Sequence, residues 1–464
     1  MRVTFSSSLL LYYSSFELIC CLLLFSCKHE RISKKAILDS ERVIYNQLFE
    51  ESEQLLKKNI FFDRKWVNSV YIKRGGQLKL QNVVNITFVK DSVLVETDDA
   101  TLYRFDKESG DIKWITKLEH PQKSSYFFFD NLLQTNITQY EKLINYYQRC
   151  ITETEECAKE IEMKGGVKIK DINLQRRIFE TRRFELERKI AELRQFFLIY
   201  TLRELKLIGI DFYSGAVRIT RYLPSLPATR PFFFDGYITY FSSDRNRFVW
   251  VNPFDFTEEF QVTIDSVPNF FKILSNHILI QDKNSLKYLD NRKIYWEVEL
   301  SSQLVDAVNV YDYGFLITSD NELILINLLT GRIEWKALLK IRGEKLLKYG
   351  GYLFIKGNDN FQLVDLTTIA KLLQSTEAYY KAGSYYELKT KGVIKNVKRF
   401  LFGDRDYLYF LGIDGIVKKY RRDTLEHIED IDGMAGYQFI WEHGSENVLL
   451  YRKPSYLYYF SFSK

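Results

Sequence analysis

A short segment of the chain recurs, and this recurrence constrains the fold more than any other feature. Residues 102–114 read LYRFDKESGDIKW, and copies follow at 207–219 (LIGIDFYSGAVRI) and 323–335 (LILINLLTGRIEW). Each copy has an apolar strand, an Asp or Asn, then Ser or Thr followed by Gly, and a second strand. The polar side chains can bond the backbone of a tight turn, and the Gly accepts the positive φ that such a turn requires. The defining residues are Asp106, Gly110 and Trp114, then Asp211 and Gly215, then Asn327, Gly331 and Trp335.

The spacing of these segments predicts the architecture. Degenerate copies have their anchor residues at Asn252, Asp290, Asp365 and Arg421, and the anchors from 211 to 365 are separated by 41, 38, 37 and 38 residues. A period of about 40 residues with four short strands per unit is typical of a β-propeller blade. The aromatic content of 16% suits half-buried strands. We therefore predict an all-β, eight-bladed β-propeller, with seven blades as the alternative.

The last blade is expected to take a strand from the other end of the chain. After Ile431 only three strands can be recognised, whereas residues 63–73 (DRKWVNSVYIK) form a Trp-containing strand with nothing of its own to pair with. Pairing the two would close the propeller and leave no long unpaired edge. The propeller is therefore predicted to span residues 63–464.

A helical segment interrupts the repeats. Asp106 and Asp211 are 105 residues apart, and the excess, residues 136–204, changes from a two-residue to a heptad rhythm. Two apolar stripes on either side of Gly165 and Gly166 predict an antiparallel helical hairpin about 40 Å long, with an acidic first helix and a basic second one. Whether residues 196–201 continue the helix or begin a strand stays open. The hairpin is either a surface decoration or an arm for a protein partner that uses Tyr146, Tyr147, Phe196, Cys150 and Cys157.

The two cysteines of this hairpin are expected to be thiols. Cys150 and Cys157 are seven residues apart in what reads as one helix, which corresponds to about 10 Å. That separation is too long for a disulfide within the helix. An intermolecular bridge is the alternative.

The N-terminus reads as a lipoprotein leader. Residues 1–27 begin with one basic residue and end in a broken apolar run, as in a secretory signal peptide. The final residues Leu24, Phe25, Ser26 and Cys27 resemble the lipobox of bacterial lipoproteins, which implies that Cys27 carries the lipids. By analogy with lipoprotein sorting, Lys28 favours the outer membrane. Residues 28–62 are predicted to form a helical tether; an ordinary cleaved signal or an uncleaved anchor remains the alternative to lipidation.

The repeats resemble those of the pyrroloquinoline-quinone-like (PQQ-like) propeller family, closely at 106–114 and 327–335 and partly at 211–215. The resemblance implies an architecture but no particular chemistry. Quinoprotein dehydrogenases of this family hold the quinone over adjacent cysteines. The adjacent cysteines here, Cys20 and Cys21, fall in the leader. No catalytic, cofactor-binding or metal-ligating residues are predicted, and the chain is expected not to be an enzyme.

A second branch of the family is non-enzymatic. Leader, lipobox, N-terminal segment and repeats resemble the BamB-type lipoproteins of the outer-membrane β-barrel assembly machinery. The resemblance implies a lipid-anchored scaffold for protein–protein interactions in the bacterial cell envelope, at the outer membrane facing the periplasm. The alternatives are a propeller that binds glycans or ligands, for instance through residues 232–234, and a quinoprotein-type oxidoreductase. A net charge of +6 without a basic tract excludes nucleic acid as the expected partner.

Overall fold

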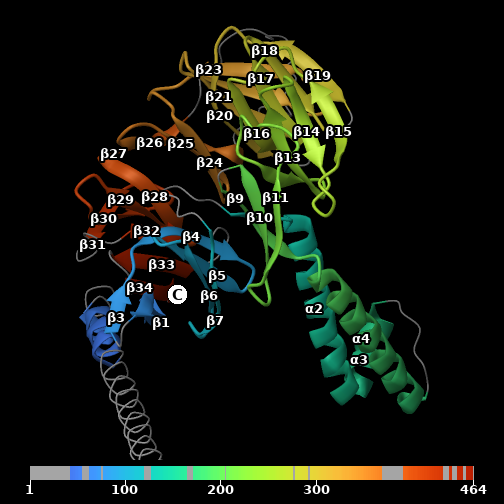
Figure 1. The fold of residues 1–464 in the computed structure, drawn as a ribbon. Helices are drawn as coiled ribbons and strands as arrows, with labels where there is room; N and C mark the ends of the chain where they lie inside the picture. Colours follow the sequence, from blue (N-terminus) through green and yellow to red (C-terminus); the bar gives the residue numbers. More distant parts are fainter. Residues whose placement is uncertain are drawn as a thin grey trace, which may run out of the picture. The chain divides into compact units, whose positions relative to one another are not determined.

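The computed structural model describes residues 42–54, 62–74, 77–119, 127–164, 171–203, 205–274, 277–290, 293–367, 390–431, 438–441, 447–452 and 456–462 (Figure 1). The predicted signal peptide, the lipobox and the first part of the tether lie outside these residues. The chain divides into two compact units. The central unit comprises Ser124–Asp430, and the terminal unit combines Met1–Lys123 with Ile431–Lys464.

The described residues form eight four-stranded antiparallel sheets and one two-stranded hairpin. Six of the four-stranded sheets belong to the central unit. Their strands are β8 (Phe128–Phe129), β9 (Leu198–Arg203), β10 (Lys206–Asp211) and β11 (Val217–Tyr222); β12 (Phe232–Phe234), β13 (Tyr237–Ser242), β14 (Arg247–Val251) and β15 (Glu258–Thr263); β16 (Phe270–Leu274), β17 (His277–Asp282), β18 (Ser285–Leu289) and β19 (Ile294–Glu299); β20 (Leu304–Val310), β21 (Tyr313–Thr318), β22 (Glu322–Asn327) and β23 (Ile333–Leu338); β24 (Lys345–Tyr349), β25 (Tyr352–Lys356), β26 (Asn360–Asp365) and β27 (Thr390–Lys395); β28 (Val397–Gly403), β29 (Tyr407–Gly412), β30 (Val417–Arg421) and β31 (His427–Ile431).

Consecutive sheets of the central unit pack face to face. Each apolar cluster joins two successive sheets: one cluster contains Leu279 and Leu316, the next Leu325 and Leu353, and another Phe354 and Phe410. The first strands are also neighbours, β8 with β12, β16 with β20 and β20 with β24. The middle strands are covered on both faces and are therefore almost continuously apolar, whereas the fourth strands alternate. This arrangement is consistent with the predicted propeller.

The terminal unit contains the two remaining four-stranded sheets. Its strands are β1 (Phe62–Ser69), β2 (Tyr71–Arg74), β3 (Gln77–Leu80), β4 (Val83–Val89), β5 (Ser92–Thr97), β6 (Thr101–Asp106), β7 (Ile112–Lys117), β32 (Gln438–Trp441), β33 (Asn447–Arg452) and β34 (Tyr456–Phe462). β1 pairs with β34, with Trp66 opposite Tyr459, which confirms that an N-terminal strand completes the last sheet. The predicted strand over 63–73 is divided, because β2 leaves this sheet and pairs with β3.

Residues 42–54 are helical and pack against the sheet that contains β1 and β34. Leu48 is buried, and the hydroxyl of Tyr458 donates to Glu51 at 2.6 Å. Arg64 of β1 binds Ser52 and Glu53, each at 2.7 Å, with its guanidinium 4.0 Å from the ring of Phe49. Residues 42–54 of the predicted tether are therefore fixed to the body of the terminal unit.

The helical segment begins and ends earlier than predicted. α2 (Asn131–Thr152), α3 (Thr154–Met163) and α4 (Ile172–Arg194) lie between β8 and β9. Asp130 and Asp171 cap α2 and α4 by accepting from backbone N–H groups of the first turns. The expected insertion over 136–204 is corrected at both ends, because residues 198–203 form β9. An ion pair between Arg194 and Glu141, with N–O separation 3.0 Å, joins α4 to α2.

The prediction of two free thiols is wrong. Cys150 and Cys157 form a disulfide, with their Cα atoms 5.4 Å apart. The single helix assumed from the sequence is broken at Glu153, whose φ is −112° and ψ 50°. Thr152 and Thr154 each bond a backbone carbonyl three residues earlier, competing with the regular helical hydrogen bonds. The break turns α3 relative to α2 and brings the sulfur atoms together.

Candidate functional site

The predicted repeat residues lie in a turn that we name the repeat turn. It runs from the anchor residue to the fourth residue after it and joins the third and fourth strands of a sheet. Oδ1 of Asp106 accepts from the backbone N–H of residues 108 and 109, each at 3.0 Å, and Asp211 and Asn327 do the same in their own turns. In all three turns the Gly N–H donates to the anchor carbonyl at 2.9 Å. These residues thus build the turns.

Each of two repeat turns receives a Trp from the preceding sheet. Trp296 of β19 donates from Nε1 to the carbonyl of Leu328 at 2.7 Å, and its ring lies over Gly331, where a Cβ atom would be 2.7 Å from it. Trp66 of β1 has the same relation to Gly110 in the terminal unit, with 2.8 Å to the carbonyl of Lys107. The sequence pointed to Trp114 and Trp335, which are also buried. The Trp that covers a repeat Gly therefore comes from another repeat.

The degenerate repeats keep the turn but change the side chains. Phe256 and Leu425 occupy the Gly position with φ of 67° and 60°, and their N–H groups donate to the anchor carbonyls at 3.1 and 2.8 Å. In the sheet β20–β23, Trp335 of the fourth strand pairs with Leu325 of the third. In the sheet β24–β27, the residue at the same position of the fourth strand is Gly392, which pairs with Leu363. A Cβ atom on Gly392 would be 3.0 Å from Leu425. The large and the small residue have exchanged places at this interface.

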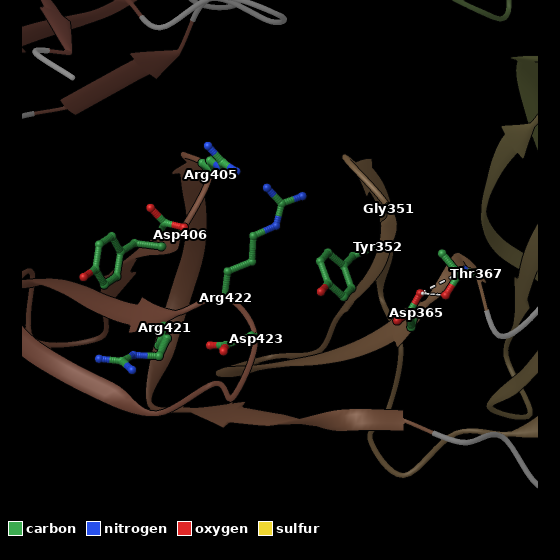
Figure 2. Close-up of a pocket in the computed structure, with 10 residues that line it drawn as sticks. Gly351, Tyr352, Asp365, Thr367, Arg405, Asp406, Arg421, Arg422 and Asp423 are labelled. Carbon is green, nitrogen blue, oxygen red and sulfur yellow. Dashed lines mark hydrogen bonds between the residues drawn. The ribbon is translucent and has the colours of Figure 1, made fainter.

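A polar pocket lies at the same interface, between the sheets β24–β27 and β28–β31. It encloses about 620 Å³ and is open to solvent (Figure 2). We name it the arginine pocket; its lining residues are Gly351, Tyr352, Asp365, Thr367, Arg405, Asp406, Tyr407, Arg421, Arg422 and Asp423. Its residues come from the β24–β25 and β28–β29 turns, the end of β26 and the repeat turn after β30. In the pair of sheets β16–β19 and β20–β23, the ring of Trp296 covers the corresponding turn.

Arg422 is held in place by three contacts. Its Nη1 donates to the carbonyl of Asp404 at 3.0 Å, its guanidinium lies 5.4 Å from the centre of the Tyr352 ring, and its Nη2 lies against Gly350. Gly350 has a φ of 56°, and a Cβ atom there would overlap Arg422. Lys391 lies 4.9 Å from the same Tyr352 ring and donates to its hydroxyl at 2.8 Å. The pocket wall thus carries a fixed cation.

Arg405 differs from Arg422 because it is exposed and, among the described residues, makes no hydrogen bond or ion pair through its side chain. Figure 2 shows its guanidinium on the same side of the pocket as that of Arg422, while Arg421 points away from both. The carboxylate of Asp365 is engaged by Thr367, at 2.9 Å from the N–H and 2.7 Å from the hydroxyl. The arrangement can hold a small anionic group between two guanidinium groups.

Sequence reasoning missed this pocket. A signal was present, since Arg-Asp pairs occur at residues 405–406 and 422–423 in two turns of one repeat. What could not be read was that the turns carrying these residues face residues 351–352 and 365–367 of the neighbouring sheet, because that depends on how the two sheets pack.

Other candidates from the sequence lie elsewhere. The aromatic run 232–234 forms β12 and is packed, with Phe234 buried and Phe232 stacked on Phe271. His277 lies between Tyr288 and Tyr295, and His427 contacts Asp430 at 2.8 Å. Cys20, Cys21 and Cys27 lie outside the described residues. Within the described ranges, no group of three His, Cys, Asp or Glu side chains is placed to hold a metal ion.

Among the described helices, none has the length and apolar character needed to span a bilayer.

No family model matches the sequence, and a search of curated proteins finds no match. Among solved structures, the chain is similar to BamB from Moraxella catarrhalis, with a TM-score of 0.49 and 10% identity over 86% of this chain and 100% of that chain. It is also similar to the computationally designed protein Ika8, with a TM-score of 0.46 and 8% identity over 82% of this chain and 96% of that one. Because both TM-scores are below 0.5, the description of the fold rests on the sheets and their cores.

Proposed function

We propose that this protein is a non-enzymatic, lipid-anchored β-propeller of eight blades that serves as a scaffold for protein–protein interactions in the bacterial cell envelope. The eight four-stranded sheets and the pairing of β1 with β34 support the propeller. The lipobox ending at Cys27 supports attachment to a membrane, and Lys28 supports the outer membrane, facing the periplasm. The expected partner is an envelope protein, with a component of outer-membrane β-barrel assembly as the first candidate.

The observation that carries the location is the Cys150–Cys157 disulfide. Both cysteines are fully buried and pack with Phe179 in the core of the helical hairpin. Disulfides persist in oxidising compartments such as the bacterial periplasm and are rare in the cytosol. The predicted leader supports export from the cytosol, and the disulfide supports an oxidising compartment. These two independent features agree on a location outside the cytosol.

The helical hairpin is the surface that we assign to a partner. Tyr146 and Tyr147 pack around the disulfide and so serve the structure of the hairpin. Phe196, which follows α4, contacts Phe254 of the β14–β15 turn edge to face but remains 50% exposed. Other apolar side chains are available: Phe184 is 69% and Leu132 63% exposed. Exposed apolar side chains on a projecting element are a common feature of interaction surfaces.

The lipid anchor is tested with the full chain and its Cys27→Ala variant, expressed in the native host. We expect the wild-type mass to correspond to a chain that begins at residue 27 and carries lipids, and the protein to fractionate with outer membranes. Crosslinking and mass spectrometry on those membranes should then identify a barrel-assembly component. An unchanged mass and location of Cys27→Ala would contradict the anchor.

The role of the hairpin is tested separately by joining β8 to β9 with a short Gly-Ser linker in place of residues 131–194. We expect the sheets to stay folded, because the insertion has its own core, and the crosslinked partner to be lost. A double variant, Leu132→Ser with Phe184→Ser, should weaken the same crosslinks without altering the fold. Unchanged crosslinks in both variants would exclude the hairpin as the contact.

A further inference from the structure

The arginine pocket combines fixed and free positive charge. Arg422 is held by the carbonyl of Asp404 and the ring of Tyr352, so it loses little conformational freedom when it binds a ligand. Arg405 is exposed and has no side-chain partner among the described residues. Two guanidinium groups that face one space repel each other, and an anion placed between them removes this repulsion.

The neighbouring acidic residues restrict which anion fits. Asp406 and Asp423 also line the pocket, so a doubly charged phosphate group meets stronger repulsion than a singly charged carboxylate. Guanidinium groups match carboxylates in geometry, with pairs of N–H donors facing pairs of oxygen atoms. The ring of Tyr352 adds an apolar wall for the carbon atoms next to that carboxylate.

We propose that the arginine pocket binds a carboxylate-bearing ligand, with Arg405 and Arg422 as the residues that hold the carboxylate. The site goes beyond the proposed scaffold function, because it needs neither the lipid anchor nor the helical hairpin. The carboxylate can belong to an acidic side chain of a protein partner or to a small organic acid. The chemistry that recognises it is the same in both cases.

The test is isothermal titration calorimetry on the mature chain at an ionic strength of about 0.15 M, where the Debye length is about 8 Å. Three probes are used: butyrate, which carries one carboxylate, a neutral-ended hexapeptide with one internal Glu, and inorganic phosphate. We expect a carboxylate probe to bind more tightly than phosphate. Arg405→Gln should weaken carboxylate binding about tenfold or more, as expected for a lost charge-assisted hydrogen bond. Arg405 is exposed and makes no side-chain hydrogen bond or ion pair among the described residues, so this variant should fold normally.

Two further variants separate a built pocket from general attraction of anions. Arg177→Gln removes an exposed positive charge from α4 and should leave carboxylate binding within about twofold, since its charge is largely screened. Gly350→Ala keeps every charge but displaces Arg422, and should weaken binding as Arg405→Gln does. Tighter binding of the peptide than of butyrate assigns the site to a protein partner, and the reverse order assigns it to a small acid. Absent carboxylate binding, tighter phosphate binding, or equal losses in Arg405→Gln and Arg177→Gln would overturn the proposal.

Discussion

Two pairs of consecutive sheets in the central unit are joined in opposite ways. Between β16–β19 and β20–β23, Trp296 comes from the fourth strand of one sheet and lies over Gly331 in the repeat turn of the next. Between β24–β27 and β28–β31, the fourth strand provides Gly392 and the repeat turn provides Leu425. The large residue has moved from the strand to the turn.

The backbone is the same in both cases. Leu425 has a φ of 60° where Gly331 has 72°, and both N–H groups bond the anchor carbonyl. A left-handed conformation costs a side chain about 1–2 kcal/mol, and the partial burial of Leu425 against Gly392 acts against this cost. Leu is smaller than Trp, and the arginine pocket is found at this interface. Both interfaces have the same turn and a contact between a large and a small residue. The large residue comes from the strand in one case and from the turn in the other.

The largest effect that separates the two interfaces is expected for Gly331→Ala. The substitution places a Cβ atom 2.7 Å from Trp296 on a backbone with φ of 72°. The left-handed strain and the overpacking together should lower the free energy of unfolding by about 2–4 kcal/mol. Denaturant unfolding measures the loss.

Gly236→Ala provides the matched control. Gly236 has a φ of 82° in the β12–β13 turn, but no atom lies within 4 Å of a Cβ placed there. Only the strain of the left-handed backbone then acts, and it should lower the free energy of unfolding by about 1 kcal/mol. Equal losses in the two variants would show that the ring of Trp296 is not pressed against the turn, and the distinction between the two interfaces would lose its basis.

Much of this fold could be predicted from the sequence, because the repeat turn depends on local chemistry. Asp106 and Gly110 fix a turn through their own side chain and φ, and the same pattern marks Asn327 and Gly331. The pairing of β1 with β34 could also be predicted. The C-terminal end of the chain has three strands where a sheet needs four, and the N-terminal end has one Trp-containing strand without a partner of its own.

The rest depended on features that no local pattern encodes. The heptad stripes continue through Glu153, so they gave no sign of the break that permits the Cys150–Cys157 disulfide. Phe256 and Leu425 occupy a position that the pattern reserves for Gly; the side chain of Phe256 is buried, and that of Leu425 is half-buried against a neighbouring sheet. The arginine pocket is lined by turns of two neighbouring sheets, residues 351–352 of one and 405–407 of the next, which no single repeat places together.

The exchange of sizes can be reversed by design. Gly392→Trp alone should lower the free energy of unfolding by about 1–3 kcal/mol, because Leu425 already occupies the space beside Gly392. Leu425→Gly alone relieves the left-handed strain but removes packing from the interface. The double variant recreates a Trp over a Gly, and we expect a favourable coupling of about 1–2 kcal/mol.

A double-mutant cycle of unfolding free energies measures this coupling. The same pair of substitutions made at positions that do not touch, Gly392→Trp with Leu205→Gly, serves as the reference for additivity. Coupling indistinguishable from that reference would mean that Leu425 does not replace the missing Trp.

The smallest effect concerns the aromatic stack behind Trp296. Tyr288 stacks on Trp296 with ring centres 5.2 Å apart, and His277 stacks on Tyr288 at 4.6 Å. Burial lowers the pKa of His277 below its usual 6.5, with Asp290 acting in the opposite direction. The folded state therefore binds fewer protons than the unfolded state at mildly acidic pH. Stability should fall as the pH decreases from about 6.5 towards the lowered pKa and level off below it.

His277→Phe keeps an aromatic ring in the stack and removes the titrating group. Unfolding midpoints measured between pH 7.5 and pH 5 should fall less steeply for this variant than for the wild type. At the interface without a Trp, His427 contacts Tyr420 edge to face, with ring centres 5.3 Å apart. His277→Phe leaves that histidine in place and therefore tests only the Trp296 side of the comparison. Parallel pH profiles for the two proteins would show that His277 is protonated as easily in the folded chain as in the unfolded one. Desolvation in the stack would then be negligible, and the packing around Trp296 would be looser than the contacts with Gly331 imply.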